Sequence, residues 1–258
     1  MSHVHPRAEV DPSAKLAQSA EVGAFATVGP EVELAEDTWV GPHAHVTGRT
    51  TVGAGTRIFS FAVVGEDPQD KSFSGETSEL LIGRGNVIRE HCSIHTGTRK
   101  GGRLTRIGDD NLFMNSVHVG HDAVIGSHCI VATFCAIAGH VVIEDHAVLG
   151  AYTGVHQLCR VGESAMAAGG SKCSQDVPPF SLVHGDRARL AGLNVIGMRR
   201  RNFSRQQIAA VKRAYHLIFS SKLRLEEALS RVREELPDSA EVERLLRFLE
   251  SSERGFCR

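Results

Sequence analysis

Histidines are the side chains of this sequence with the widest chemical range. There are 14 of them, and imidazole exchanges a proton near neutral pH more readily than other side chains. The runs NSVHVGHDAVIG (115–126) and AGHV (138–141) bring three of them close together in the sequence, namely His118, His121 and His140. Others are expected to be exposed residues without a chemical role: His3, His5, His43, His45, His128 and His146. Which histidines meet in space depends on the elements that carry them.

A six-residue repeat defines those elements. From residue 4 to residue 64, eleven successive sixth positions are aliphatic: Val4, Val10, Leu16, Val22, Val28, Leu34, Val40, Val46, Val52, Ile58 and Val64. The repeat resumes at Ile82 and again, shifted by one residue, at Ile107, from where it runs to Val161. A period of six fits neither a helix nor a hairpin meander. If each aliphatic residue points inward from a short strand, three units close a coil of 18 residues, and stacked coils pair about 4.8 Å apart. The pattern predicts a parallel β-helix.

This sixfold pattern resembles the hexapeptide-repeat transferases, whose β-helix is left-handed, an exception to the usual crossover hand. We therefore expect a mainly β protein, with a left-handed parallel β-helix over residues 1–182 and an α-helical domain over 183–258. Two insertions, at 66–79 and 98–105, are expected to loop out of the prism, and such loops commonly carry binding function. Pro178 and Pro179 are expected to end strand pairing.

Beyond the prolines the period becomes helical. Ser204 and Gln207 form a capping-box pattern at the start of one helix, and Ser239 opens the last one. A third helix between them is expected to stop at Pro237. The apolar faces of the three are Ile208, Val211, Tyr215 and Ile218; Leu225, Leu229, Val232 and Leu236; and Val242, Leu245, Leu246 and Leu249.

Charge separates the same two regions. Residues 1–182 carry 13 Lys and Arg against 20 Asp and Glu, whereas residues 183–258 carry 16 against 10. The net charge of −1 argues against a nucleic-acid-binding protein, but the basic tail suits an acidic partner. The six cysteines form no CxxC pair, and no signal peptide or long apolar stretch is present. We expect a cytoplasmic protein without stable membrane insertion.

The length of one coil, 18 residues, predicts which histidines lie close together. Residues 18 apart share a column, so His121, Gly139 and Gln157 superpose, and His140 and His156 lie on the neighbouring columns. An imidazole on such an outer edge suits general base catalysis. Asp122 can orient the ring of His121, and the N–H of Gly139 can bind an oxyanion. The rival interpretation is a zinc site built from the three imidazoles of His121, His140 and His156.

The motifs and their order make the resemblance specific. The two histidine runs, VHQ (155–157), QDVPPF (175–180), GLNVIGMRRRNFSR (192–205), IHTGT (94–98) and the PQD and GE elements of the first insertion are similar to the UDP-N-acetylglucosamine acyltransferases of lipid A biosynthesis. That resemblance implies a bacterial homotrimer with active sites between neighbouring prisms. It implies transfer of a 3-hydroxyacyl group from acyl carrier protein to the glucosamine 3-hydroxyl of UDP-N-acetylglucosamine. No metal and no cofactor is implied beyond the carrier's phosphopantetheine.

The resemblance also assigns residues. It implies His121 as general base, with Asp122 and Gly139 as its catalytic partners. Positions implied to bind substrate are Gln69, Asp70, Lys71, His95, His118, His140, His156, Gln157, Gly169, Asn194, Arg200 and Arg201. Gly169 matches the position that measures acyl length, and a glycine there leaves room for a 3-hydroxymyristoyl chain.

Two positions depart from the family pattern. The family's loop lysine is replaced by Ser72, one residue after Lys71, and an acidic residue of the tail is replaced by Ile196. A 3-amino UDP-sugar therefore stays open as an alternative acceptor. The related N-acyltransferase carries an additional domain before its β-helix, whereas here the repeats begin at Val4. An acetyl-CoA-dependent transferase leaves the basic tail unexplained. A zinc enzyme of the gamma carbonic anhydrase class and a purely structural β-helix are the remaining alternatives.

Overall fold

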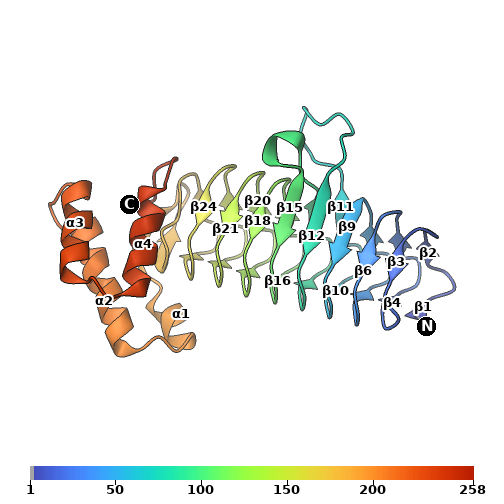
Figure 1. Ribbon diagram of the computed structural model, residues 1–258, viewed down its shortest axis with the longest axis horizontal. Helices are drawn as coiled ribbons and strands as arrows, with labels where there is room; N and C mark the ends of the chain where they lie inside the picture. The colour runs from blue at the N-terminus through green and yellow to red at the C-terminus, as the bar shows by residue number, and fades with distance from the viewer. Residues whose placement is uncertain (1–2) are drawn as a thin grey trace.

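The computed structural model describes residues 3–258, and most of this chain winds into a three-sided prism that ends in a group of helices (Figure 1). Each side of the prism is one sheet. Face A contains β1 (His3–Val4), β4 (Glu21–Val22), β7 (Trp39–Val40), β10 (Arg57–Ile58), β13 (Val87–Ile88), β16 (Leu112–Phe113), β19 (Ile130–Val131), β22 (Val148–Leu149), β25 (Met166–Ala167), β27 (Ser181–His184) and β28 (Arg189–Leu193). Face B contains β2 (Glu9–Val10), β5 (Thr27–Val28), β8 (His45–Val46), β11 (Val63–Glu66), β14 (Ser93–His95), β17 (His118–Val119), β20 (Ala136–Ile137), β23 (Gly154–Val155) and β26 (Lys172–Cys173). Face C contains β3 (Lys15–Leu16), β6 (Glu33–Leu34), β9 (Arg49–Val52), β12 (Glu79–Ile82), β15 (Leu104–Ile107), β18 (Val124–Ile125), β21 (Val142–Ile143) and β24 (Arg160–Val161).

The six-residue repeat is the core of this prism. On the parallel strand pairs of the prism the inward positions are aligned, as in Val22 with Val40 and Val119 with Ile137. From Val22 onward these side chains are almost completely buried, and together they form one continuous apolar column. The one-residue shift of the repeat is also explained, because Ile82 pairs with Ile107 across the second insertion. The predicted parallel β-helix is confirmed.

Both insertions leave the prism near one another. The first occupies residues 67–78 between β11 and β12, and the second contains a short 3-10 helix, η1 (Arg99–Gly101). They project together from one side of the prism (Figure 1), and the backbone N–H of Arg99 donates to the Glu76 carboxylate at 3.2 Å. The expected end of the second insertion at Thr105 is wrong. Leu104 and Thr105 already pair with β12, because Thr105 is a buried position of the coil.

Strand pairing continues one strand beyond the prolines. Leu182 in β27 pairs in parallel with Met166, so the expected end of pairing at Pro178 and Pro179 is wrong. The prolines lie in the connection that precedes β27, where their missing N–H groups cost no ladder bond. The chain then turns back through β28, which is antiparallel to β27.

The tail contains the three expected helices and one more. These are α2 (Arg205–Tyr215), α3 (Leu225–Glu235) and α4 (Ala240–Glu250), with a π-helical turn, η2 (His216–Ser220), after α2. The predicted capping box of Ser204 and Gln207 is present, and Ser239 caps α4. The additional helix, α1 (Val195–Arg200), is short and contains a glycine, so its sequence carries no clear helical pattern. None of the helices in residues 3–258 combines the length and the apolar character needed to cross a membrane.

Two buried asparagines hold successive coils together at the corner between faces C and A. The side chain of Asn86 donates to the carbonyls of Gly83 and Gly108 and accepts from the N–H of Asn111. Asn111 in turn accepts from the N–H of Cys129 at 2.7 Å. Both amides are almost fully buried, so their hydrogen bonds replace bonds to water at a point where the coil has no strand pairing.

We predict that Asn86→Ala lowers the free energy of unfolding by about 2–4 kcal/mol, because buried backbone groups lose their partners. Chemical denaturation at fixed protein concentration measures this. Asn115→Ala is the matched control, because that half-buried side chain bonds only to Thr133 in the described chain. Equal stability losses in the two variants would contradict the structural role of Asn86.

Candidate active site

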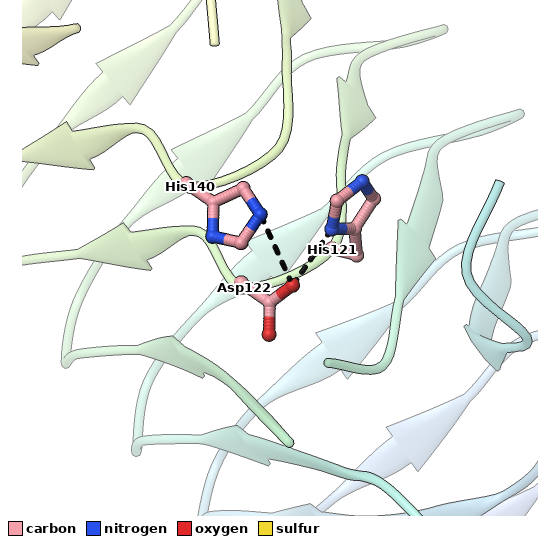
Figure 2. A group of neighbouring side chains, drawn as sticks. All are labelled: His121, Asp122 and His140. Carbon is pink, nitrogen blue, oxygen red and sulfur yellow. Dashed lines mark hydrogen bonds and ion pairs between the residues drawn. The ribbon is translucent and has the colours of Figure 1, made fainter. Parts of the chain in front are cut away.

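His121 lies at the corner between faces B and C, two residues after β17. Its Nδ1 is 2.7 Å from Oδ2 of Asp122, and the ring of His140, one coil further on, stands at 89° to its own, with ring centres 5.1 Å apart. Nε2 of His140 is 3.7 Å from the same carboxylate oxygen. Figure 2 shows both imidazoles converging on Asp122. The stacking of coils therefore brings His121, Asp122 and His140 together, as their spacing predicts.

The second insertion fixes the Asp122 carboxylate. Thr98 donates its backbone N–H to one carboxylate oxygen at 2.8 Å and its hydroxyl to the other at 2.7 Å. The N–H of Asp122 itself donates to the hydroxyl of Thr105. Gly101 packs directly against the carboxyl group, so that any side chain at this position would overlap Asp122. The carboxylate is 1% exposed, and these donors stabilise its charge.

Thr98, Gly101 and Thr105 contact Asp122, and the sequence interpretation did not single them out. Their only signal is the small, polar composition of TRKGGRLT, which is also typical of an unconstrained surface loop. The contact of this loop with Asp122 joins residues 24 apart, and only the folded chain reveals it.

The arrangement defines the tautomer of His121. An ionised carboxylate only accepts hydrogen bonds, so Nδ1 carries the proton that is donated to Asp122, and the lone pair is left on Nε2. Nε2 faces the first insertion, where Oδ2 of Asp70 lies 3.8 Å away. In this tautomer the ring presents its lone pair toward the space between the prism and the insertion.

Asp70 is held in a turn of its own. The N–H of Ser72 donates to its carboxylate at 2.7 Å, and hydrogen bonds from Ser72 lower the pKa of Asp70, with smaller contributions from His121 and Lys100. Gln69 and Lys71 flank it and are exposed. Neither of these two side chains forms a hydrogen bond or ion pair with another residue of the range 3–258.

His95 and His118 form a second imidazole pair beside the first insertion. Nδ1 of His118 is 2.9 Å from the Ser93 hydroxyl, and Nδ1 of His95 donates to the Asp67 carbonyl at 2.7 Å. Nε2 of His95 is buried and has no hydrogen-bond partner within the described chain. Burial lowers the pKa of His118, and the neighbouring His95 and His121 lower it further. His118 is therefore neutral at pH 7.

Gly139 stacks on the ring of His121. A Cβ at this position would lie 2.6 Å from Nε2 of His121, closer than a side chain can approach, so only glycine permits the imidazole to lie over this backbone. Within residues 3–258 the N–H of Gly139 donates no hydrogen bond. Its N–H is thus left without a partner in the described chain, next to a backbone position that lies against the His121 ring.

The geometry does not favour the rival interpretation, a zinc site of three histidines. The group with metal-ligand proximity consists of His121, Asp122 and His140, whereas His156 is exposed and its Nδ1 lies 3.1 Å from the Gln157 carbonyl. Ligands of a tetrahedral zinc ion are about 3.3 Å apart, given bond lengths of about 2.0 Å. The separation of 2.7 Å between His121 and Asp122 is that of a hydrogen bond. These residues fit acid–base chemistry better than metal binding.

The remaining expected residues lie elsewhere on the prism. Asn194 caps α1 through the N–H of Gly197 and donates to the Ser164 carbonyl, and Arg201 pairs with Glu163 at 3.1 Å. With the exposed Arg200 they border a groove of about 680 Å³ on face A, whose apolar wall includes Ile130, Val148 and Met166. Gly169 is at the corner between faces A and B, and Gln157 is exposed in the column of Gly139. Within one chain the residues of this groove do not contact His121.

The fold and the His121–Asp122 pair define a transferase of the hexapeptide-repeat class, and the comparisons agree. The bacterial transferase hexapeptide model matches residues 104–139, and the model of UDP N-acetylglucosamine O-acyltransferase domain 2 matches residues 176–257. The UDP-N-acetylglucosamine O-acyltransferases of Myxococcus xanthus (strain DK1622) and of Anaeromyxobacter sp. (strain Fw109-5), which use acyl-acyl-carrier-protein according to their names, are 47% and 49% identical, over 100% and 99% of both chains. The LpxA structure from Acinetobacter baumannii has a TM-score of 0.96 at 40% identity and covers 99% of each chain. The chain belongs to the UDP-N-acetylglucosamine O-acyltransferase family, and its β-helix is left-handed.

We predict that His118 makes the stability of the protein depend on pH. Its pKa in the folded chain lies below the ordinary value of 6.5, so the unfolded chain takes up the proton first as the pH falls. The stabilising contribution is complete above about pH 6.5 and is lost below it. His118→Asn should flatten the decrease of Tm between about pH 7 and pH 5. Thermal unfolding across this range measures the effect, with His184→Asn at an exposed strand position as control. An unchanged slope in His118→Asn would rule this role out.

Proposed function

We propose that this protein transfers a 3-hydroxyacyl group from acyl carrier protein to the 3-hydroxyl of UDP-N-acetylglucosamine, the first step of lipid A biosynthesis, in the bacterial cytoplasm. Its family supports the activity. The observation that carries the mechanism is His121, whose Nδ1 is 2.7 Å from a buried carboxylate while its ring lies against the backbone of Gly139. No metal and no cofactor takes part, apart from the phosphopantetheine that carries the acyl group.

In this mechanism His121 acts first as a base and then as an acid. Nε2 removes the proton of the sugar hydroxyl while its oxygen attacks the carbonyl carbon of the thioester. The tetrahedral oxyanion accepts a hydrogen bond from Gly139, and Asp122 stabilises the imidazolium. Collapse of the intermediate breaks the carbon–sulfur bond, and the imidazolium returns its proton to the departing thiolate. The ester forms, and both proton transfers balance.

The first insertion is the proposed acceptor side. Asp70, Gln69 and Lys71 stand on the loop that faces Nε2 of His121, and a sugar held there would present its hydroxyl to the base. His118 and His95 line the same side. The unpartnered Nε2 of His95 is available to accept a hydrogen bond from a sugar hydroxyl, and the neutral His118 can do so without introducing a charge.

The donor side needs a second copy of the chain. The apolar groove of face A and the His121 corner are on different parts of the prism, but Ile130, Val148 and Met166 belong to the same coils as Ala136, Gly154 and Lys172 on face B. In a homotrimer with parallel axes, face A of one prism can meet face B of its neighbour at the same height. The cleft between them would then extend from His121 along the prism toward Asn194 and Arg200, with His140, His156 and Gln157 along its edge.

The basic tail is the proposed docking region for the acidic carrier protein. Arg199 and Arg200 are exposed and can bind phosphate groups, since guanidinium pairs with phosphate in a bidentate manner. Arg201 is engaged by Glu163, so its proposed contact with substrate would require that pair to rearrange. This half-buried ion pair instead holds the start of the helical tail against the prism.

We predict that His121→Ala lowers kcat by about two to four orders of magnitude, because the general base is lost. The assay uses UDP-N-acetylglucosamine and 3-hydroxyacyl carrier protein, and size-exclusion chromatography checks the oligomer. His184→Ala should retain wild-type rates. Full activity of His121→Ala would remove His121 from the mechanism.

We predict that Gly169→Met shifts acyl preference toward shorter chains. Gly169 is exposed, and a Cβ there would approach only the backbone of Ala151, at 3.2 Å from its carbonyl oxygen, so a large side chain has to extend away from the prism and into the proposed cleft. Competition between 3-hydroxyacyl carrier proteins of different length measures the change. An unaltered length profile would show that this corner does not border the acyl chain.

A further inference from the structure

The two insertions carry opposite charge where they meet beside the active site. The acids of the first insertion are Asp67, Asp70 and Glu76, with Lys71 as its one cation, whereas the second contains Arg99, Lys100 and Arg103 and no acid. Within residues 3–258, none of the three basic side chains of the second insertion forms a hydrogen bond or an ion pair, and only their backbone groups are bonded. These cations therefore do not hold the loop in place and are available to an anionic ligand.

Lys100 is the middle residue of η1, and the residues on both sides of it are fixed. Before it, the N–H of Arg99 donates to the Glu76 carboxylate of the first insertion at 3.2 Å. After it, Gly101 packs against the carboxyl group of Asp122 so closely that any side chain there would overlap it. The backbone of Lys100 is therefore held between the first insertion and the carboxylate that orients the general base.

The charge of Lys100 acts on Asp70, at the entrance to the general base. Oδ2 of Asp70 is 3.8 Å from Nε2 of His121. Hydrogen bonds from Ser72 are the main cause of the lowered pKa of Asp70, and His121 and Lys100 lower it further. An anionic substrate that approaches Nε2 comes close to the Asp70 carboxylate, which repels it. A cation beside Asp70 offsets this repulsion and draws the anion to the site.

Lys71 is next to Asp70 in the sequence but lies at the exposed tip of a turn. The N–H of Phe73 donates to the Asp70 carbonyl at 3.0 Å, and the N–H of Ser72 donates to the Asp70 carboxylate at 2.7 Å. These bonds close a turn over residues 70–73 in which Lys71 and Ser72 are the two central residues. Within residues 3–258 neither of the two is bonded outside this turn. Of the two lysines near Asp70, Lys100 therefore has the more firmly held backbone.

We propose that Lys100, on the second insertion, is the cation that binds the diphosphate group of the UDP-sugar acceptor. The inference rests on the proposed function and adds a binding residue to it. Lysine suits this role, because its ammonium group sits on a flexible four-carbon stem and can follow a phosphate while the backbone stays fixed. The second insertion then serves both parts of the reaction. Thr98 and Gly101 hold the carboxylate that orients the base, and Lys100 holds the acceptor in front of it.

The test measures acceptor and donor kinetics in wild type, Lys100→Gln, Lys100→Arg, Lys71→Gln and Arg103→Gln. Arg103 is the matched control, since it is an exposed cation of the same insertion and lies outside η1. We expect Lys100→Gln to raise KM for UDP-N-acetylglucosamine by about tenfold or more, because a charge-assisted hydrogen bond is lost. Lys100→Arg keeps the charge and should raise KM much less. Lys71→Gln should also raise it less than Lys100→Gln does, and Arg103→Gln should leave it unchanged.

A structural defect would give a different result. If the substitution only disturbed η1, Asp122 would lose its support, and both kcat and Tm would fall. A diphosphate contact instead leaves Tm, kcat and KM for the acyl carrier protein within about twofold of wild type. It also makes KM for the UDP-sugar less dependent on salt than in wild type, because one ionic contact is missing. A fall in kcat with unchanged KM would overturn the inference.

The inference and the proposed function fail in different ways. If wild type acylates UDP-N-acetylglucosamine and Lys100→Gln keeps the wild-type KM, the diphosphate contact is refuted and the function stands. A rise in KM confined to the acyl carrier protein also refutes it, since the phosphate of the donor would then be the bound group. Calorimetric titration with UDP and with UDP-N-acetylglucosamine does not depend on turnover. Weaker binding of both to Lys100→Gln supports the contact even if another UDP-sugar is the acceptor, and absence of binding to wild type overturns it.

Discussion

Alignment of equivalent residues in successive coils is the constraint on which the whole structure depends. The buried aliphatic residue of each hexapeptide keeps its strand in register with the strands above and below, and a slip of one residue would turn every inward side chain outward. Because the core fixes the register, each corner residue lies directly over its equivalent in the next coil. This places Gly139 against the ring of His121. The site is thus a consequence of core packing as much as of its own polar contacts.

The coils alone do not make the site reactive. They bring the imidazole of His121 against the backbone of Gly139, but the carboxylate that orients the imidazole is held by residues outside the repeat. Thr98 and Gly101 cover Asp122 from the second insertion, and the first insertion directs Asp70 at the other ring nitrogen. A regular stack supplies rigidity, and the interruptions supply the enclosure that catalysis needs.

The sequence was sufficient to predict whatever follows from periodicity. The prism and its core depend on intervals of six and eighteen residues, which can be recognised in the sequence. The same intervals bring together His121, Asp122, Gly139 and His140. The helix caps at Ser204 and Ser239 were legible because capping uses local side chains. The Thr98–Asp122 contact was not, since the path of an insertion depends on tertiary contacts. The position of His156 was also missed, because column arithmetic gives a height and an edge but not the direction of a side chain. Strand β27 followed the prolines because pairing with β25 outweighs their local effect.

The stacked coils also place outward residues at regular intervals along each face of the prism. Face B presents one outward residue per strand spacing of about 4.8 Å, which corresponds to roughly four extended methylene groups. A substitution of the outward residue in one coil therefore changes the surface of face B over one strand spacing of about 4.8 Å. Finer adjustment has to come from the size of the side chain within a coil. A ligand that lies along this face therefore meets a different side chain at each coil, and a substitution in one coil changes that contact while the fold stays the same.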